Sequence, residues 1–161
     1  YCTDRADEFL ADSLRTYDGK EFRSAVDGDL GLEDEPKTQE SESDKECLAF
    51  IKETLGDRVD EVKASQKLKS HPVCMTSGEG LTFEMEKYFQ AVQPELSMKA
   101  KRILEVNVAH PAFLKLESVR ATDPELAKKY AEVLYNQALL IAGLPLADPS
   151  GYTDLVCSLW S

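Results

Sequence analysis

The sequence lacks several of the patterns by which a catalytic or metal-binding protein is recognised. It contains neither G-x-x-x-x-G-K-[ST] nor G-x-G-x-x-G, which excludes the two commonest glycine-rich phosphate cradles. Its four cysteines, at positions 2, 47, 74 and 157, are too far apart for a zinc knuckle or a C-x-x-C redox pair. We therefore expect no metal site, no bound cofactor and free thiols.

Long apolar runs and a secretory leader are also missing. No run approaches the roughly 18 apolar residues that a membrane-spanning helix requires. Residues 1–5 supply neither the basic region nor the apolar region of a signal peptide. These absences predict a cytoplasmic protein with no membrane partner. The chain does not begin with Met, which fits a piece of a longer protein.

Positive charge is scarce, and the negative charge is concentrated in one segment. Residues 27–46 hold nine acidic residues against two lysines, which places −7 of the total net charge of −11 there. The longest basic cluster is the short run Lys99-Ala100-Lys101-Arg102. Because nucleic-acid binding requires clustered lysine and arginine side chains, we expect no nucleic-acid partner.

Catalytic groupings are absent as well. His71 precedes a proline in a predicted turn and His110 stands at a predicted helix start. At such positions a histidine is more often structural than catalytic, so we expect structural roles for both. No Ser/His/Asp or Cys/His arrangement is suggested, and acidic residues in the first turn of a helix normally complement its dipole. The sequence therefore predicts no enzymatic activity.

The pattern divides the chain into three parts. Residues 1–26 resemble the end of a preceding domain, with a helix over 4–17, a turn at Asp18-Gly19 and a strand over 20–26. Residues 27–45 predict an acidic linker or loop, because they offer almost no apolar surface to bury. Residues 46–161 form the main domain.

The order of elements in the main domain predicts an α+β fold. A helix from about Ser43 stops at Gly56, and two strands follow, one ending near Leu68 and one over 73–76, which we interpret as a hairpin. A third strand over 103–108 follows a helical insert, and only helices follow that strand. We therefore expect a sheet of about three strands, packed with helices on one face.

The last two helices, over 125–142 and 149–160, carry more apolar surface than a small sheet needs. Two such helical hairpins, related by a twofold axis, form a four-helix bundle that buries the surplus. The alternative is a monomeric protein-binding module in which both helices only complete its own core. The pattern alone leaves both interpretations open.

The helical insert over residues 81–92 is the second candidate surface. Positions 81, 85, 88, 89 and 92 share one apolar face, with residues 82, 84, 86 and 87 opposite. Methionine combined with aromatic residues suits adaptable binding of varied partners. Packing of this face into the core is the alternative that spacing does not exclude.

Several short segments in series resemble the heat-shock protein 90 family, in its bacterial HtpG type. They are Thr3-Asp4-Arg5-Ala6-Asp7-Glu8-Phe9, Tyr17-Asp18-Gly19-Lys20, Leu55-Gly56-Asp57-Arg58-Val59, Arg102-Ile103-Leu104-Glu105-Val106-Asn107, Asn136-Gln137-Ala138-Leu139-Leu140 and Leu146-Ala147-Asp148-Pro149-Ser150-Gly151-Tyr152. They occur in the family's order and cover nearly the whole chain.

The resemblance implies a chaperone of the stress response whose C-terminal domain, here 46–161, follows the end of the middle domain. It implies a homodimer held by the last two helices, with these interface residues: Leu126, Tyr130, Leu134, Ala138, Ile141, Tyr152, Leu155, Val156, Leu159 and Trp160. It also implies a surface for non-native client proteins, made of Leu81, Met85, Tyr88 and Phe89 together with Glu8, Phe9 and Asp12. The family's ATP and Mg²⁺ site belongs to domains upstream of Tyr1, so the resemblance implies no nucleotide site in this chain.

Overall fold

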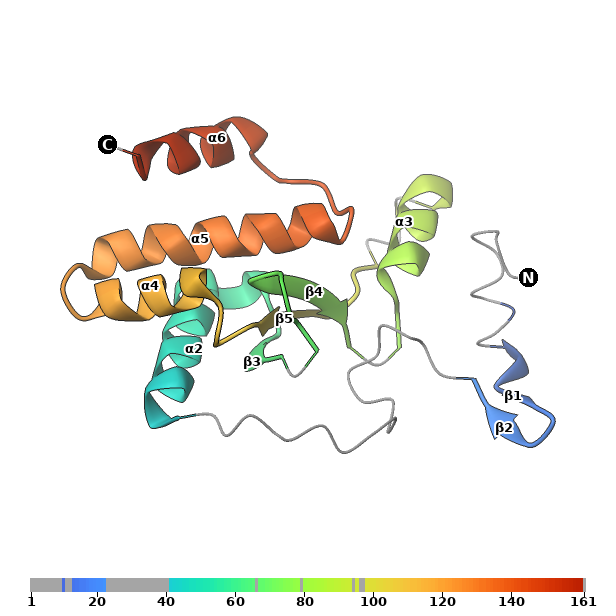
Figure 1. The fold of residues 1–161 in the computed structure, drawn as a ribbon. Coiled ribbons are helices and arrows are strands. Elements are labelled where there is room, and N and C mark those ends of the chain that lie inside the picture. The colour runs from blue at the N-terminus through green and yellow to red at the C-terminus, as the bar shows by residue number, and fades with distance from the viewer. Residues whose placement is uncertain are drawn as a thin grey trace. The chain divides into compact units, whose positions relative to one another are not determined.

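The computed structural model describes residues 10, 13–22, 41–65, 67–78, 80–93, 95 and 98–160 (Figure 1). The elements are β1 (Thr16–Tyr17), β2 (Lys20–Glu21), α2 (Glu42–Leu55), the 3-10 turn η1 (Gly56–Arg58), β3 (Glu61–Ala64), β4 (Val73–Ser77), α3 (Phe83–Val92), β5 (Arg102–Val106), α4 (Pro111–Arg120), α5 (Pro124–Ile141) and α6 (Pro149–Ser158). Two compact units result, one from 1–33 with 77–101 and the other from 34–76 with 102–161.

A two-stranded antiparallel hairpin, β1–β2, belongs to the first unit. Asp18 and Gly19 both have positive φ, 50° and 73°, as the tight turn of a two-residue hairpin requires. The predicted helix over 4–17 is wrong at its end, because Thr16 and Tyr17 are extended and pair with β2. The rest of that helix and of the predicted strand over 20–26 lies mostly outside the described residues.

Helix α2 opens the second unit with a capping box. The Ser41 hydroxyl accepts the Asp44 N–H at 3.1 Å, and the Asp44 carboxylate accepts the Ser41 N–H at 2.8 Å. The helix ends at Gly56, whose φ is 58°. It begins at Glu42, one residue before the predicted start at about Ser43.

The three-stranded sheet has the order β3-β5-β4, so the predicted β3–β4 hairpin is wrong. β3 runs parallel to β5, with Val62 opposite Leu104 and Ala64 opposite Val106. The Asn107 N–H donates to the Pro72 carbonyl at 2.8 Å, whereas Gly78 at the other end of β4 donates to Lys101, so β4 is antiparallel to β5. The central position of β5 fits its side chains, since Leu104 and Val106 are fully buried.

Helices α2, α4 and α5 pack against one another, and α2 also contacts β3. The largest fully buried side chains of this core include Phe113 and Leu116 of α4 and Ile51 of α2. On β4, the buried residues Val73 and Met75 alternate with half-buried ones, as expected when one face of a sheet packs on helices. The predicted α+β class, with a small sheet packed against helices, is confirmed.

The last three helices begin where the sequence predicts. His110, Asp123 and Asp148 are their N-caps, each followed by a proline in the first turn, and each cap side chain accepts a backbone N–H. Helix α5 ends before Gly143, whose φ is 64°. Helices α5 and α6 contact each other and form the predicted hairpin (Figure 1).

Candidate dimerisation and client-binding surfaces

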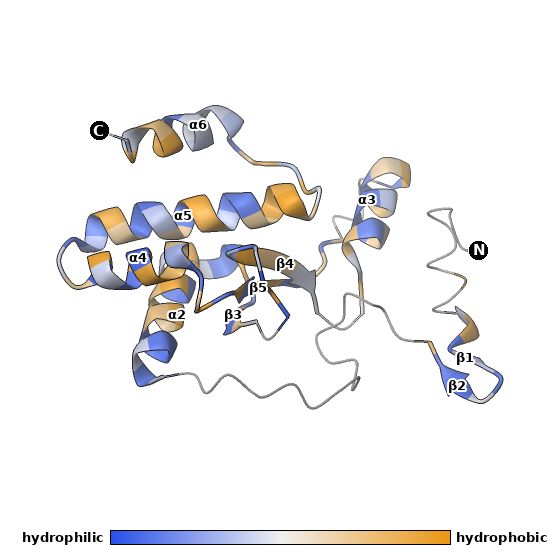
Figure 2. Cartoon of the chain, in the orientation of Figure 1, coloured by the Kyte–Doolittle hydropathy of each residue, from blue (hydrophilic) through white to orange (hydrophobic). Residues whose placement is uncertain are grey.

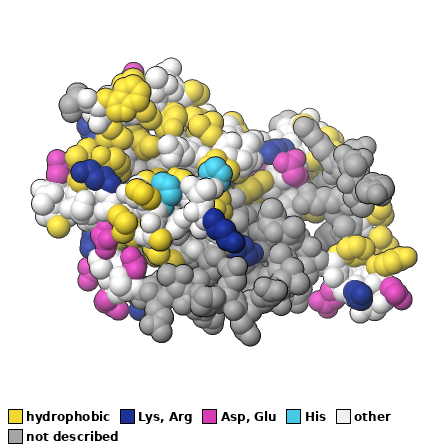
Figure 3. All heavy atoms as spheres, viewed as in Figure 1, with side chains coloured by type: hydrophobic (Ala, Val, Ile, Leu, Met, Phe, Trp, Pro, Cys, Tyr) yellow, Lys and Arg dark blue, Asp and Glu magenta, His cyan; other side chains and the backbone are white. Residues whose placement is uncertain are grey.

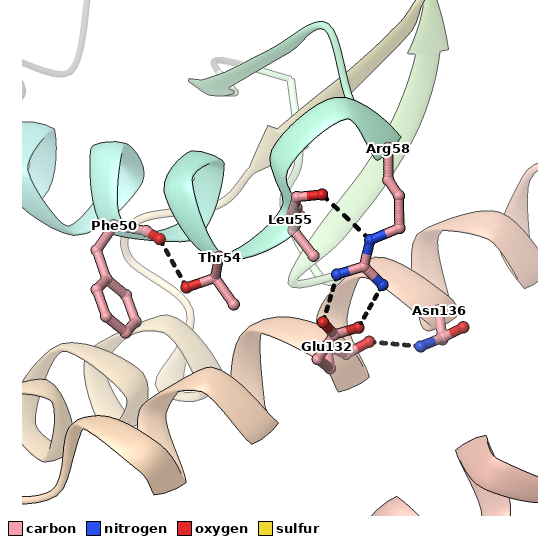
Figure 4. Close-up of polar contacts among 6 residues, drawn as sticks. All are labelled: Phe50, Thr54, Leu55, Arg58, Glu132 and Asn136. Carbon is pink, nitrogen blue, oxygen red and sulfur yellow. Dashed lines mark hydrogen bonds and ion pairs between the residues drawn. The ribbon is translucent and has the colours of Figure 1, made fainter.

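An arginine fixes α5 to the rest of its unit (Figure 4). The Arg58 guanidinium, in η1, donates from both terminal nitrogens to the Glu132 carboxylate of α5, and its Nε donates to the Leu55 carbonyl at 3.1 Å. The same guanidinium lies 5.2 Å from the Tyr135 ring centroid. The hydrogen bond with Glu132 raises the pKa of Arg58 above its ordinary value. No local sequence pattern indicates this pair, because its partners are 74 positions apart.

Helix α5 buries much of its own apolar surface within one copy of the chain. Ala127, Ala131 and Ala138 are fully buried, and Leu134 is 4% exposed. Two predicted interface residues, Leu134 and Ala138, are therefore already covered. Of the other three on this helix, Leu126 and Tyr130 are half-buried and Ile141 is 53% exposed. The exposed apolar surface of α5 thus lies at its C-terminal end, where Leu140 is 51% exposed.

Helix α6 has no buried residue. Its predicted interface residues Tyr152, Leu155 and Val156 are half-buried, as is Leu159 just beyond its end, and Trp160 is 82% exposed. Hydrophobic residues concentrate towards the C-terminal end of this helix (Figure 2), and hydrophobic side chains gather over α6 on the face drawn in Figure 3. The structure thus brings together the predicted residues of α6 on an incompletely covered surface.

Helix α3, in the first unit, contains three of the predicted client-binding residues, and Leu81 precedes it. The Thr82 hydroxyl caps the helix by accepting the Met85 N–H at 3.2 Å. Tyr88 is 41% exposed and packs edge to face on Phe89, with ring centroids 5.8 Å apart. Met85 is only 7% exposed, so it supports the helix instead of lying on its open surface.

Glu86 belongs to the residues opposite the apolar face of the insert, yet it is only 2% exposed. Its carboxylate accepts the Ala100 N–H at 2.7 Å and the side-chain amide of Gln90 at 3.1 Å. A buried carboxylate that accepts a backbone N–H holds the chain after α3 against the helix. Helical spacing could not reveal this contact, because residue 100 lies outside the helix.

The three other predicted client-binding residues, Glu8, Phe9 and Asp12, lie outside the described residues. Leu10 and Leu14, close to them in the sequence, are 55% and 52% exposed.

Two cysteine thiols of the described residues are shielded from solvent to different degrees. Burial raises the pKa of the Cys47 and Cys74 thiols to about 11, which keeps them protonated and unreactive at neutral pH. No group of three or more His, Cys, Asp or Glu side chains among them could hold a metal ion. Within this part of the chain, no helix is both long and apolar enough to cross a bilayer.

Together these features define an α+β chain in which α5 and α6 form a helical hairpin with an incompletely covered apolar face. Residues 1–161 match the family model described as Hsp90 protein, so the chain belongs to the Hsp90 family. It is 43% identical over 162 residues to the Chaperone protein HtpG of Oceanobacillus iheyensis and 43% identical over 161 residues to that of Clostridium acetobutylicum. Each alignment covers 99% of this chain and 26% of the relative, so the chain spans about a quarter of the relatives' length.

Proposed function

We propose that this chain is the homodimerisation region of an HtpG-type chaperone, with residues 46–161 as its C-terminal domain. One observation carries the proposal: α6 is rich in apolar residues and yet buries none of them within a single copy. A helix with such a stripe is stable in water when another apolar surface covers it. A second copy supplies that surface, because two identical hairpins form a closed four-helix bundle about a twofold axis.

The competing function is a monomeric protein-binding module. Sedimentation equilibrium of the 161-residue chain at micromolar concentration distinguishes the two. We expect a mass of twice the 18.0 kDa of one chain. A mass of one chain across the micromolar range would favour the module and would leave the apolar surface of α6 to a different partner.

We further propose that α3 presents part of a surface for non-native client proteins. Tyr88 and Val92 support this role, being 41% and 56% exposed on a helix otherwise held by the buried Met85 and Glu86. Exposed aromatic side chains on an anchored helix contribute contact area at low entropic cost.

Binding of reduced, carboxymethylated α-lactalbumin, a permanently non-native protein, tests this surface. The double variant Tyr88→Ser with Val92→Ser should weaken binding about tenfold while the urea midpoint stays unchanged, since both side chains are exposed. The matched control, Leu114→Ser on the exposed side of α4, should bind as the unmodified chain does. Unchanged binding by the double variant would remove α3 from the client surface.

Nucleotide chemistry belongs, in this proposal, to the part of the relatives that this chain does not span. The chain alone would then neither bind nor hydrolyse ATP and would need no Mg²⁺ or other cofactor, acting in the cytoplasm through its own second copy and its clients. Isothermal titration of the chain with ATP and Mg²⁺ tests this point, and a saturable heat of binding would contradict it.

A further inference from the structure

Helix α3 carries a buried carboxylate on the side away from its exposed aromatic residue. Glu86 is 2% exposed, whereas Tyr88 is 41% exposed. Two residues advance about 200° around an α-helix, which turns these two side chains to roughly opposite sides. A contact that holds Glu86 therefore determines which way Tyr88 faces.

Two hydrogen bonds orient the Glu86 carboxylate. Its Oε2 accepts the Ala100 N–H at 2.7 Å, and its Oε1 accepts the side-chain amide of Gln90 at 3.1 Å. Gln90 lies one turn further along α3, so its amide helps to hold the carboxylate in the orientation that reaches Ala100. Ala100 is itself only 3% exposed. A charge-assisted bond that is shielded from water in this way is stronger than a contact on the surface.

The polar contacts of the first turns of α3 stabilise the helix locally. The Thr82 hydroxyl caps the helix, and Glu84 forms an ion pair with Lys87 at 2.6 Å, three positions further along. The bond between Glu86 and Ala100, in contrast, spans 14 positions and fixes the helix as a body to the chain that follows it. It therefore acts on the position of α3, whereas the other two act on its helical structure.

We propose that Glu86 is the positioning residue of the client-binding surface on α3. The inference rests on the proposed function of this helix. While the carboxylate holds Ala100, α3 is restrained from rotating about its axis, and Tyr88 and Val92 stay on its open side. A surface held in its binding orientation pays less entropy when it takes up a non-native chain. Glu86 acts through the helix and contacts no client itself.

Two matched variants of α3 test the proposal in the 161-residue chain. Glu86→Ala removes the acceptor of the Ala100 N–H, whereas Glu84→Ala removes a carboxylate from an exposed position of the same helix. In Glu86→Ala, we expect hydrogen exchange of the Ala100 amide, followed by NMR, to accelerate at least about tenfold. Its affinity for reduced, carboxymethylated α-lactalbumin should fall about fivefold, because the helix must now be ordered on binding. Glu84→Ala should leave both quantities within about twofold of the unmodified chain.

The conservative variant Glu86→Gln separates positioning from a general loss of stability. Its side-chain carbonyl can still accept the Ala100 N–H, so client affinity should return to within about twofold of the unmodified chain. Unchanged client affinity in Glu86→Ala, despite faster exchange at Ala100, would overturn the proposal. Loss of protection at every amide of α3 would overturn it too, because Glu86 would then be needed to form the helix and not to position it.

The double variant Tyr88→Ser with Val92→Ser distinguishes failure of this inference from failure of the proposed function. If the double variant loses client binding while Glu86→Ala keeps it, α3 remains a client surface and only the positioning role of Glu86 is refuted. If the double variant binds as the unmodified chain does, α3 is not a client surface and both proposals fail.

Discussion

Helices α5 and α6 belong to one hairpin but differ in what holds them. Helix α5 buries seven residues, contacts α2 and α4, and is joined to η1 by the Arg58–Glu132 ion pair. Helix α6 buries none and contacts α5. The first helix is therefore part of the fold of a single chain, whereas the second has apolar surface left for association. The difference predicts that damage to α5 lowers the stability of the chain and that damage to α6 lowers its assembly.

The largest effect is expected from charging α6. The double variant Leu155→Glu with Leu159→Glu should weaken the proposed dimer by about 1,000-fold or more, about 4 kcal/mol, because carboxylates would enter its proposed apolar interface. Sedimentation velocity measures the change, and circular dichroism should show the helices retained. Lys128→Glu changes the charge by the same amount at an exposed position of α5 and should leave the dimer intact. A double variant that stays dimeric would place the interface elsewhere.

The second largest effect distinguishes the role of α5 from that of α6 most directly. Leu134 of α5 was predicted as an interface residue, yet it is 4% exposed within one copy. Leu134→Ala should therefore lower the free energy of unfolding by about 2–4 kcal/mol, the cost of a cavity in a core. Urea denaturation measures this, with Leu114→Ala on α4, where the side chain is 48% exposed, as the matched control. An unchanged urea midpoint, accompanied by a weaker dimer, would indicate that Leu134 lies in the dimer interface after all.

Local signals in the sequence were sufficient for the helices that carry this comparison. The N-caps at His110, Asp123 and Asp148, each with a proline in the first turn, mark helix starts by contacts within a few residues, so the predicted starts are confirmed. Hydrophobic periodicity likewise identified α2 and the α+β order.

Contacts between distant residues account for the errors. The pairing of β3 with β5 instead of β4 depends on strands about forty positions apart, and neither strand alone specifies its neighbour. The burial of Glu86 depends on the backbone of Ala100, and the shielding of Leu134 within one copy depends on how α5 packs. A helical wheel assigns a face to each residue, but it cannot state what lies opposite that face.

A smaller effect should follow from weakening the anchor of α5. Arg58→Lys keeps the charge but loses the two-pronged hydrogen bonding to Glu132 and the stacking on Tyr135. Because the Arg58 side chain is 45% exposed, the expected loss of stability is only about 0.5–1 kcal/mol. The urea midpoint measures it. Arg120→Lys, at a surface pair with Glu46, is the matched control and should change the midpoint less. Equal shifts of the urea midpoint in the two variants would show that the paired hydrogen bonds of Arg58 add no stability beyond that of its charge.

The smallest effect concerns the reactivity of the cysteine thiols. It compares the covered core with the incompletely covered helix α6 without a substitution in either. Cys157 lies exposed on α6, whereas burial raises the pKa of Cys47 and Cys74 from 9.0 to about 11. At pH 8 the folded chain therefore holds far less thiolate at the buried Cys47 and the half-buried Cys74, and a thiol reagent reaches them less easily than Cys157. In a Cys2→Ser background, we expect Cys157 to react with a disulfide reagent at least about tenfold faster than the other two. The raised pKa values also mean that these thiols favour the folded state below pH 9, and that this contribution is lost as the pH rises through about 11. Comparable rates at all three cysteines would show that the core around α2 and β4 opens as readily as α6, and the contrast between the covered and uncovered parts of this unit would not hold.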